Sequence, residues 1–309
     1  MTVLDQLPQG ARIAVIRLRS LGDCVLTTPA LALLKKERPD LNVAVVVEER
    51  FRAVFEGNPD ISELLSPEWD MVRRWKADLC VNLHGGTRSQ WISALSGSRW
   101  RAGFANHNTT LAYNVKIPRA QKVMGVQRTV HTAEHMASAF FALGVPLQEV
   151  PRAQLFVNAP LSGEAVGSGR YAVFHPFASA PDKQWQPGRF CEVARYLDLW
   201  NIKPVFLAGP RDDVAEFRAH QIVQGSLTDA KALLAKAAAF IGNDSGPAHM
   251  AAAFGVPSVV LFGASNHAIW GPWQTESEVV ISQEGLRDVS VSRVVAAVER
   301  LRIVEEAHA

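Results

Sequence analysis

The segment from Ala237 to Pro272 limits the possible folds most, because it contains a strand, a turn, a helix and a second strand. The apolar run that ends at Ile241 predicts a buried strand, and the polar residues 242–246 predict a tight turn. Residues 248–254 are small and apolar, which predicts a helix packed closely on a sheet, and 258–262 predicts the next buried strand. This order of elements is typical of an α/β protein with a parallel sheet.

The turn in this segment carries groups that suit an anion. Pro247 fits the first turn of a helix, because its fixed φ is helical and its missing N–H would be unpaired there. Asp244 or Ser245 would cap the helix, and Gly246 and His249 follow. Free N–H groups and the helix dipole favour a phosphate at such a position. The alternative is that Asp244 and Ser245 only cap the helix and that His249 is an ordinary helix histidine.

The beginning of the chain repeats this order of elements. Residues 12–18 predict a strand, 19–23 a polar turn, and 25–36 a helix. Asp23 would therefore stand near a helix start at the carboxyl edge of a sheet, where α/β proteins bind ligands. Two interpretations of Asp23 stay open: an N-cap of the helix, or a catalytic base.

Composition excludes several classes of protein. The chain has 309 residues, enough for two domains that each bury a core. Apolar residues make up 48% and charged residues 20%, which indicates a globular protein, and the net charge of +2 does not indicate a nucleic-acid binder. The three cysteines are far apart in sequence, which predicts a reducing compartment and no disulfide framework.

We expect a cytoplasmic protein, because neither a signal peptide nor an apolar span of about 18 residues is found. Peripheral contact with the cytoplasmic face of the inner membrane is left open. We expect no metal, since His131 and His135 are four residues apart but lack an HExxH pattern or a third ligand. Gly167 and Gly169 precede a strand and lack a third glycine, which disfavours a dinucleotide cofactor.

Basic residues gather near strand ends in the first half. The predicted strand 77–83 ends at a loop that contains His84. The arginines near the strand ends are Arg17, Arg19, Arg88, Arg99 and Arg101. Together they suit a phosphorylated, acidic acceptor, although isolated arginines are usually solvated. The irregular, basic segment 106–128 is interpreted as a loop for acceptor or membrane-surface contact, with a solvated loop as the alternative.

The second half begins after a segment rich in Pro, Gly, Ser and Ala, 144–169, which predicts a domain boundary. Residues 170–175 predict a first strand, and Lys183 lies in the loop before a helix over 187–199. The closing residues 288–303 predict an amphipathic helix.

Three motifs resemble those of the ADP-heptose:lipopolysaccharide heptosyltransferases. They are RLRSLGDCVLTTPALALLKKERPD near the start, FHPFASAPDKQWQPGRFCEVARYL in the middle, and NDSGPAHMAAAFGVPSVVLFG in the segment described first. The resemblance implies the GT-B fold, with two Rossmann-like domains that face each other across a cleft. It gives an acceptor domain at 1–155, a nucleotide-sugar domain at 156–288, and a C-terminal helix at 289–309 that returns to the first domain.

The resemblance also implies roles for single residues. Asp23 would be the base that activates the acceptor hydroxyl, and Lys183 would contact the donor phosphates. The ribose would be held by Asp213 or Glu216, between which the spacing does not decide. The other donor-binding residues would be Asp244, Ser245, Gly246 and His249, and the acceptor-binding residues Arg17, Arg19, His84, Arg88 and Arg101. Family members often have Thr at the position of Ser245.

The function that follows is an inverting transfer of heptose from ADP-heptose to a lipopolysaccharide inner-core acceptor, with no cofactor and no metal. The transfer requires the two domains to close. Three alternatives keep the fold: a transferase for another nucleotide sugar, a nucleotide-sugar 2-epimerase, and a protein that binds a nucleotide sugar without turnover. The missing GxGxxG pattern disfavours a nicotinamide oxidoreductase.

Overall fold

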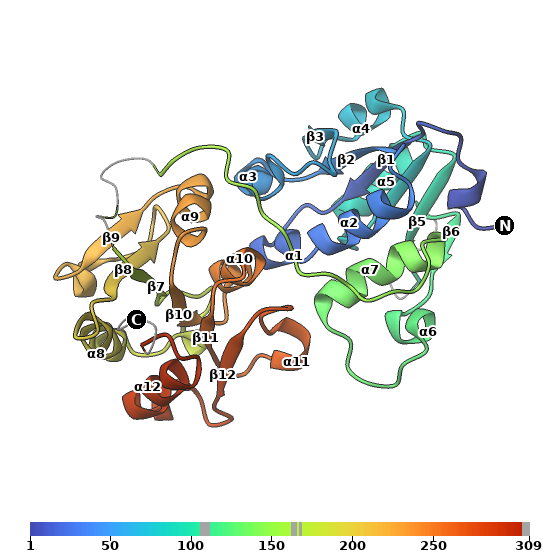
Figure 1. The fold of residues 1–309 in the computed structure, drawn as a ribbon. Coiled ribbons are helices and arrows are strands. Elements are labelled where there is room, and N and C mark those ends of the chain that lie inside the picture. The colour runs from blue at the N-terminus through green and yellow to red at the C-terminus, as the bar shows by residue number, and fades with distance from the viewer. Residues whose placement is uncertain (106–111, 162–165, 167–168, 305–309) are drawn as a thin grey trace. The chain divides into compact units, whose positions relative to one another are not determined.

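The computed structural model describes residues 1–105, 112–161, 166 and 169–304. The chain divides into two compact units, Met1–Phe156 and Val157–Ala309, which run from blue to green and from yellow to red in Figure 1. Each unit contains a six-stranded parallel sheet among its described residues. This arrangement confirms the predicted class of two Rossmann-like α/β domains.

The sheet of unit 1 has the strand order β3-β2-β1-β4-β5-β6, which is the Rossmann order. Its strands are β1 (Arg12–Ile16), β2 (Asn42–Val46), β3 (Glu63–Leu65), β4 (Leu79–Asn82), β5 (Trp100–Phe104) and β6 (Val115–Ile117). Its helices are α1 (Leu21–Val25), α2 (Thr28–Glu37), α3 (Arg52–Phe55), α4 (Trp69–Trp75), α5 (Thr87–Leu95), α6 (Ala120–Met124) and α7 (Thr132–Leu143).

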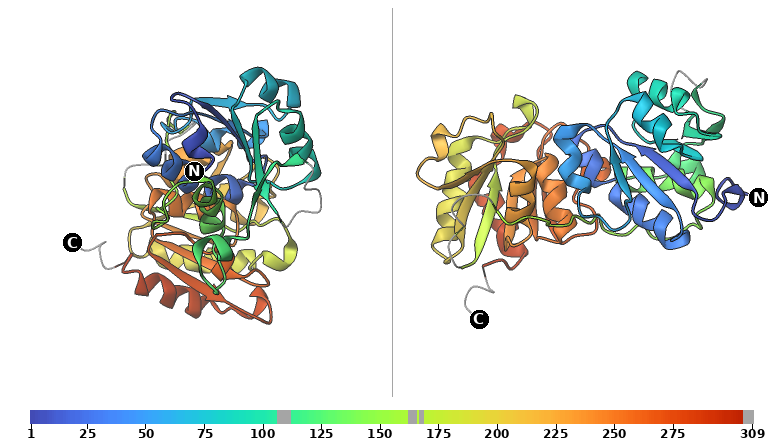
Figure 2. Two further views of the ribbon diagram at one scale, coloured as in Figure 1. Left: turned by 90° about the vertical axis from the view of Figure 1, so that its right-hand side faces the viewer. Right: turned by 90° about the horizontal axis from the view of Figure 1, so that it is seen from above.

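Both faces of this sheet are buried. Ile16 of β1 packs in a cluster with Val72 of α4 and Ile92 of α5. Ile13 and Val15 point to the opposite face and are also fully buried. Helices α2 and α7 lie side by side in this unit, as Figures 1 and 2 show.

Unit 2 repeats the Rossmann order, because its sheet runs β12-β11-β10-β7-β8-β9 and β7 is its first strand. Its strands are β7 (Tyr171–His175), β8 (Lys203–Ala208), β9 (Gln221–Gln224), β10 (Ala239–Asn243), β11 (Ser258–Phe262) and β12 (Ser277–Ile281). Its helices are α8 (Pro187–Asp198), α9 (Leu227–Leu234), α10 (Gly246–Phe254), α11 (His267–Trp270) and α12 (Val291–Arg300). Trp185, fully buried, lies in the core with Phe174 and Phe206.

Two expectations need correction, and a third stays a prediction. Val294, Ala297 and Val298 of α12 lie in the core of unit 2, so this helix packs on its own unit, and its return to unit 1 stays a prediction. The segment 106–128 is not all loop: it contains β6, which pairs with β5, and α6, which ends at a left-handed Gly125 with a φ of 67°. Residues 106–111 of that segment lie outside the described residues, and its contact with an acceptor or a membrane surface stays a prediction.

The second correction concerns the helix predicted over 25–36: it begins at Thr28 as α2, and a separate short helix, α1, starts within the predicted turn. Pro29 lies in the first turn of α2. Proline has no N–H with which to continue the hydrogen bonds of a preceding helix, so the chain starts a new helix here. The break leaves α1 as a short helix at the carboxyl end of β1.

Candidate active site

The candidate residues of each unit lie where its strand order reverses, which is where open α/β sheets bind ligands. In unit 1 the reversal falls between β1 and β4, and in unit 2 between β7 and β10. The fourth strand of each unit ends in a buried asparagine, Asn82 in β4 and Asn243 in β10. Each asparagine bonds the backbone of the loops around it, so each fixes the shape of its carboxyl edge.

Asp23 is held from two sides at the start of α1. Its Oδ2 accepts bonds from the hydroxyl of Ser20 at 2.8 Å and from the N–H of Ser20 at 3.3 Å. Its Oδ1 lies 3.2 Å from Nη1 of Arg17. The Asp23 side chain is 19% exposed, so this fixed carboxylate can still reach a ligand.

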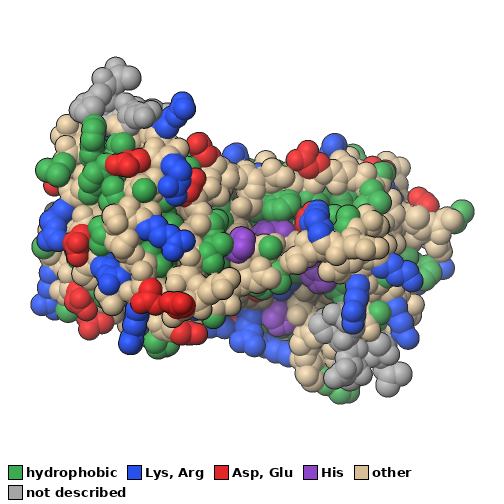
Figure 3. Space-filling view, turned by 90° about the horizontal axis from the view of Figure 1, so that it is seen from below, with side chains coloured by type: hydrophobic (Ala, Val, Ile, Leu, Met, Phe, Trp, Pro, Cys, Tyr) green, Lys and Arg blue, Asp and Glu red, His purple; other side chains and the backbone are tan. Residues whose placement is uncertain are grey.

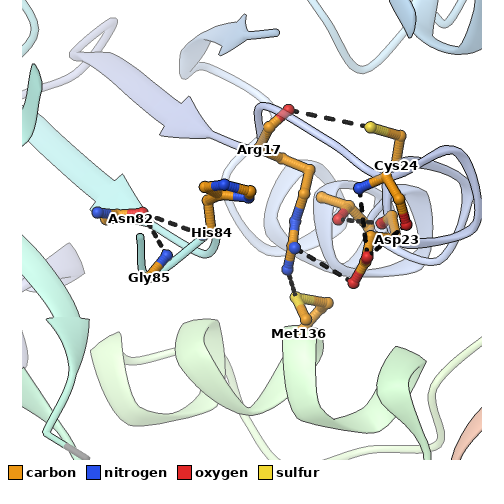
Figure 4. Close-up of polar contacts among 9 residues, drawn as sticks. Arg17, Asp23, Cys24, Asn82, His84, Gly85 and Met136 are labelled. Atoms are coloured by element: carbon orange, nitrogen blue, oxygen red, sulfur yellow. Dashed lines mark hydrogen bonds and ion pairs between the residues drawn. The ribbon is translucent and has the colours of Figure 1, made fainter. Parts of the chain in front are cut away.

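Arg17 is buried at the end of β1, with 4% of its side chain exposed. One guanidinium nitrogen contacts Asp23 and the other contacts the sulfur of Met136 on α7 (Figure 4). Burial lowers the pKa of this guanidinium, and the nearby Asp23 carboxylate opposes that effect. Arg17 therefore holds the Asp23 carboxylate in place, and its burial leaves little of its surface for contact with an acceptor.

The loop after β4 brings His84 close to Arg17, as Figure 4 shows. Oδ1 of Asn82 accepts the N–H groups of His84 at 3.0 Å and Gly85 at 3.1 Å. Burial and the charge of Arg17 lower the pKa of His84. The histidine is therefore a neutral group at neutral pH, suited to a hydrogen bond with a ligand.

The other arginines do not form one cluster. Arg19 and Arg88 are exposed at the carboxyl edge, after β1 and at the start of α5. Arg101 lies at the other edge, near the amino end of β5, where its guanidinium bonds the carbonyls of Ala112 and Ser98. Arg99 precedes the same strand and stacks on Trp100. Arg101 therefore does not lie with the other predicted acceptor residues, because the amino end of β5 is at the opposite edge of the sheet from the carboxyl strand ends.

In unit 2, Ser245 is the N-cap residue of α10 and Gly246 is its first helical residue. The Ser245 hydroxyl does not bond the helix but lies 3.1 Å from Nδ1 of His175, the last residue of β7. Asn243 joins the neighbouring loops, because it accepts the Trp185 N–H at 3.1 Å and donates to the Pro176 carbonyl at 2.7 Å. The start of α10 is therefore set rigidly against β7 and the loop before α8.

Lys183 approaches the same place from that loop, in a 3-10 turn formed by Pro181–Lys183. Its Nζ lies 3.3 Å from Oδ2 of Asp244, and about a third of the lysine side chain is exposed. His249 is buried one turn into α10, with its ring centre 6.5 Å from that of Trp270. A lysine ammonium and a helix N-terminus side by side form a site for an anion.

The two candidates for the ribose stay undecided. Asp213 is exposed and accepts the N–H of Ala215, whereas its neighbour Asp212 accepts the N–H of Gly209. Glu216 is exposed in a 3-10 turn, Ala215–Phe217. Its backbone carbonyl accepts a hydrogen bond from the thiol of Cys191 on α8. Both residues follow β8 in the chain, and β8 is the neighbour of β7 in the sheet.

Acid should weaken the β7–β10 edge through His175. Burial lowers the pKa of His175 from the usual 6.5 to about 4, so between these values the unfolded chain binds a proton that the folded unit does not. The stabilisation by neutral His175 is complete above the unfolded pKa and is lost as the pH falls. We expect a loss of about 2 kcal/mol in the free energy of local opening from about pH 7.5 to about pH 5.

Hydrogen exchange of the β7 and β10 amides, corrected for intrinsic rates, measures this loss. The His175→Gln variant should lose much less protection over the same pH range. Equal losses in both proteins would assign the acid sensitivity to other groups.

The described residues hold no group of three His, Cys, Asp or Glu side chains suited to a metal ion. His131 caps α7 and accepts the Ala133 N–H, and His135 stacks on Phe104 with ring centres 4.1 Å apart. Every helix in this part of the chain is too short or too polar to cross a membrane. Basic and acidic side chains intermingle on the face that Figure 3 shows, in keeping with the small net charge.

Sequence reasoning missed four residues that build these edges: Ser20, Asn82, His175 and Asn243. Three of them are the last residues of strands: Asn82 of β4, His175 of β7 and Asn243 of β10. A polar residue at the carboxyl end of an otherwise apolar strand is a signal that could have identified them.

Comparisons with known proteins identify the family. Lipopolysaccharide heptosyltransferase 3 of Escherichia coli is 28% identical over 82% of this chain and 83% of its own length. A family 9 glycosyltransferase structure from Veillonella parvula matches with a TM-score of 0.80 and 24% identity, covering 96% of this chain and 97% of that one. The structure of E. coli ADP-heptose lps heptosyltransferase II gives 0.78 and 20%, covering 96% and 99%. The model of glycosyltransferase family 9 (heptosyltransferase) matches residues 69–294, so the chain belongs to that family.

Proposed function

We propose that this protein transfers heptose from ADP-heptose to a saccharide of the lipopolysaccharide core. The observation that carries the proposal is the anion site at the start of α10, where Lys183 meets a helix N-terminus in a family 9 chain. A diphosphate is the part of ADP-heptose that such a site would bind. The names of the E. coli relatives support the choice of donor and acceptor.

In the proposed reaction, Asp23 removes the proton from an acceptor hydroxyl as its oxygen attacks the anomeric carbon. The bond from that carbon to the diphosphate oxygen breaks, and ADP leaves with the electron pair. A single displacement of this kind inverts the anomeric configuration. Lys183 and the N–H groups at the start of α10 stabilise the charge that grows on the diphosphate, so we propose transfer without a metal.

The other residues keep these groups in place. Asp244 orients Lys183, and the contact of Ser245 with His175 sets the start of α10. On the acceptor side, His84, Arg19 and Arg88 lie at the same edge as Asp23 and are available for an acidic sugar. Asp213 or Glu216 holds the ribose, and ADP affinities of Asp213→Asn and Glu216→Gln would decide between them.

The test of this function is ADP release with ADP-heptose and a core saccharide that lacks heptose. We expect release only when both substrates are present, equal rates with and without a chelator, and a product of inverted configuration by the NMR coupling of its anomeric proton. Donor binding without ADP release, for every core saccharide tried, would contradict the transferase proposal.

Replacing Lys183 by Met should weaken ADP binding by about 10- to 100-fold, because a charge-assisted contact with the diphosphate is lost. Isothermal titration calorimetry at fixed salt measures this dissociation constant. Lys203→Met is the matched control, since Lys203 is an exposed lysine of the same unit at the amino end of β8. If both variants bind ADP as the parent does, Lys183 is not a phosphate ligand.

A further inference from the structure

A groove of about 350 Å³ lies between α4 and α5 of unit 1, outside the site described above. Two tryptophans line it, Trp69 at the start of α4 and Trp91 in the middle of α5, with Leu95 beside them. The tryptophans are 48% and 64% exposed. Large apolar side chains gathered on a surface are typical of a binding site.

The groove is also lined by charged groups. Glu68, Asp70 and Arg88 belong to its walls. The Arg88 side chain is 57% exposed, and its nearest carboxylate oxygens, on Glu68 and Glu48, are 3.8 and 3.9 Å away. These distances are too long for hydrogen bonds. One guanidinium nitrogen, Nη2, donates to the carbonyl of Pro67 at 3.4 Å, and the other donors of this exposed group can bind a ligand. Flat apolar faces with donors and acceptors at their rim suit a molecule that is apolar on one face and carries hydroxyls at its edge.

The position of the groove ties it to the acceptor side of unit 1. Helices α4 and α5 start at the carboxyl ends of β3 and β4, the edge that also carries Asp23 and His84. Arg88 approaches Glu48, whose N–H bonds the carbonyl of Leu18 directly after β1. The groove therefore begins at the edge that carries the proposed base and runs along α5 to Leu95.

We propose that the α4–α5 groove is a second carbohydrate subsite, which takes an outer sugar of the acceptor and not the ring that is glycosylated. The weakly positive C–H groups of a sugar ring would stack on the negative faces of Trp69 and Trp91. Its hydroxyls would donate to Glu68 or Asp70 and accept from Arg88. The inference rests on the proposed transfer to a saccharide acceptor.

A membrane surface is the competing occupant, because tryptophan and arginine also favour the interface of a bilayer. Two features of the groove disfavour it. The tryptophans line a hollow instead of a projecting surface, and two carboxylates line the same hollow, which anionic headgroups would repel.

The test compares Trp91→Ala and Trp69→Ala with the parent, using two delipidated core saccharides. One ends at the sugar that is glycosylated, and the other carries further sugars. We expect KM for the longer saccharide to rise about 5- to 30-fold in each variant, as when a tryptophan at the centre of a binding site is truncated. KM for the short saccharide and kcat for both should not change. Leu147→Ala is the control, an exposed apolar residue of unit 1 outside the groove.

Direct binding separates this inference from the proposed function. Saturation-transfer NMR with the longer saccharide and no donor should show contacts that Trp91→Ala removes. This signal tests sugar binding in the groove even if the parent protein transfers heptose to neither saccharide. Such a lack of transfer would contradict only the proposed function. Equal KM values of parent and variants for the longer saccharide would overturn the subsite. The subsite would also be overturned if the variants no longer sedimented with vesicles of phosphatidylethanolamine and phosphatidylglycerol but still bound the longer saccharide as the parent does.

Discussion

Replacement of Asp23 by Asn should lower kcat by about 10²- to 10⁴-fold, the usual effect of removing a general base. The amide keeps the shape of the side chain but cannot take the proton of the acceptor hydroxyl. ADP binding should not change, because the proposed donor contacts lie in unit 2. Single-turnover release of ADP measures the chemical step, and calorimetry measures the affinity for ADP.

The chain offers an unusually close control for this variant. Asp229 has the same place in α9 that Asp23 has in α1, because its Oδ2 accepts the N–H of Ser226 at 2.9 Å and its hydroxyl at 2.7 Å. Asp229→Asn removes a capping carboxylate with no proposed role in catalysis. If Asp23→Asn and Asp229→Asn reduce kcat equally, Asp23 is only a helix cap and the assignment of the base is wrong.

The central strands of both sheets could be predicted because burial on both faces gives them continuous apolar runs. The run predicted at 258–262 coincides with β11, and the strand predicted at 170–175 begins one residue before β7. The four edge strands β3, β6, β9 and β12 were missed, since they are partly exposed and most of them are short, and so was β5, which contains Arg101. Such strands lack an apolar run, and their pairing is decided by the neighbouring strand.

The site could be predicted in part for a related reason. The turns after β1 and β10 are local in sequence, so Asp23 and Ser245 were found at helix starts. The partners of these residues come from distant segments: His175 is 70 residues from Ser245, and Lys183 is 61 from Asp244. Sequence spacing does not show which strands become neighbours. These pairs form because β10 lies next to β7 in the sheet.

Arg17 shows the same limit for burial. Its sequence position, at the end of a strand and beside a polar turn, fits an exposed contact to an acidic acceptor equally well. The structure places the side chain inside unit 1, between Asp23 and Met136. This location leads to a prediction that separates support of the base from contact with the acceptor.

Arg17→Met should lower kcat by about 10²-fold, because a base that is misplaced by about 1 Å loses that much. Methionine fills a similar volume but cannot bond Oδ1 of Asp23. Arg17→Lys keeps the charge without the planar donor pair, and its kcat should fall between those of Arg17→Met and the parent. Because Arg17 lies in unit 1 and the proposed ADP contacts lie in unit 2, a circular dichroism melting curve like that of the parent, and not ADP affinity, shows that each variant is folded.

A double-mutant cycle with Asp23→Asn makes the prediction specific. If Arg17 acts through Asp23, the double variant should be no slower than Asp23→Asn alone, since there is no base left to orient. If Arg17 binds the acceptor itself, the two losses should multiply and KM for the acceptor should rise in Arg17→Met. The first outcome makes Arg17 a positioning residue, and the second returns it to the acceptor site that its sequence position predicted.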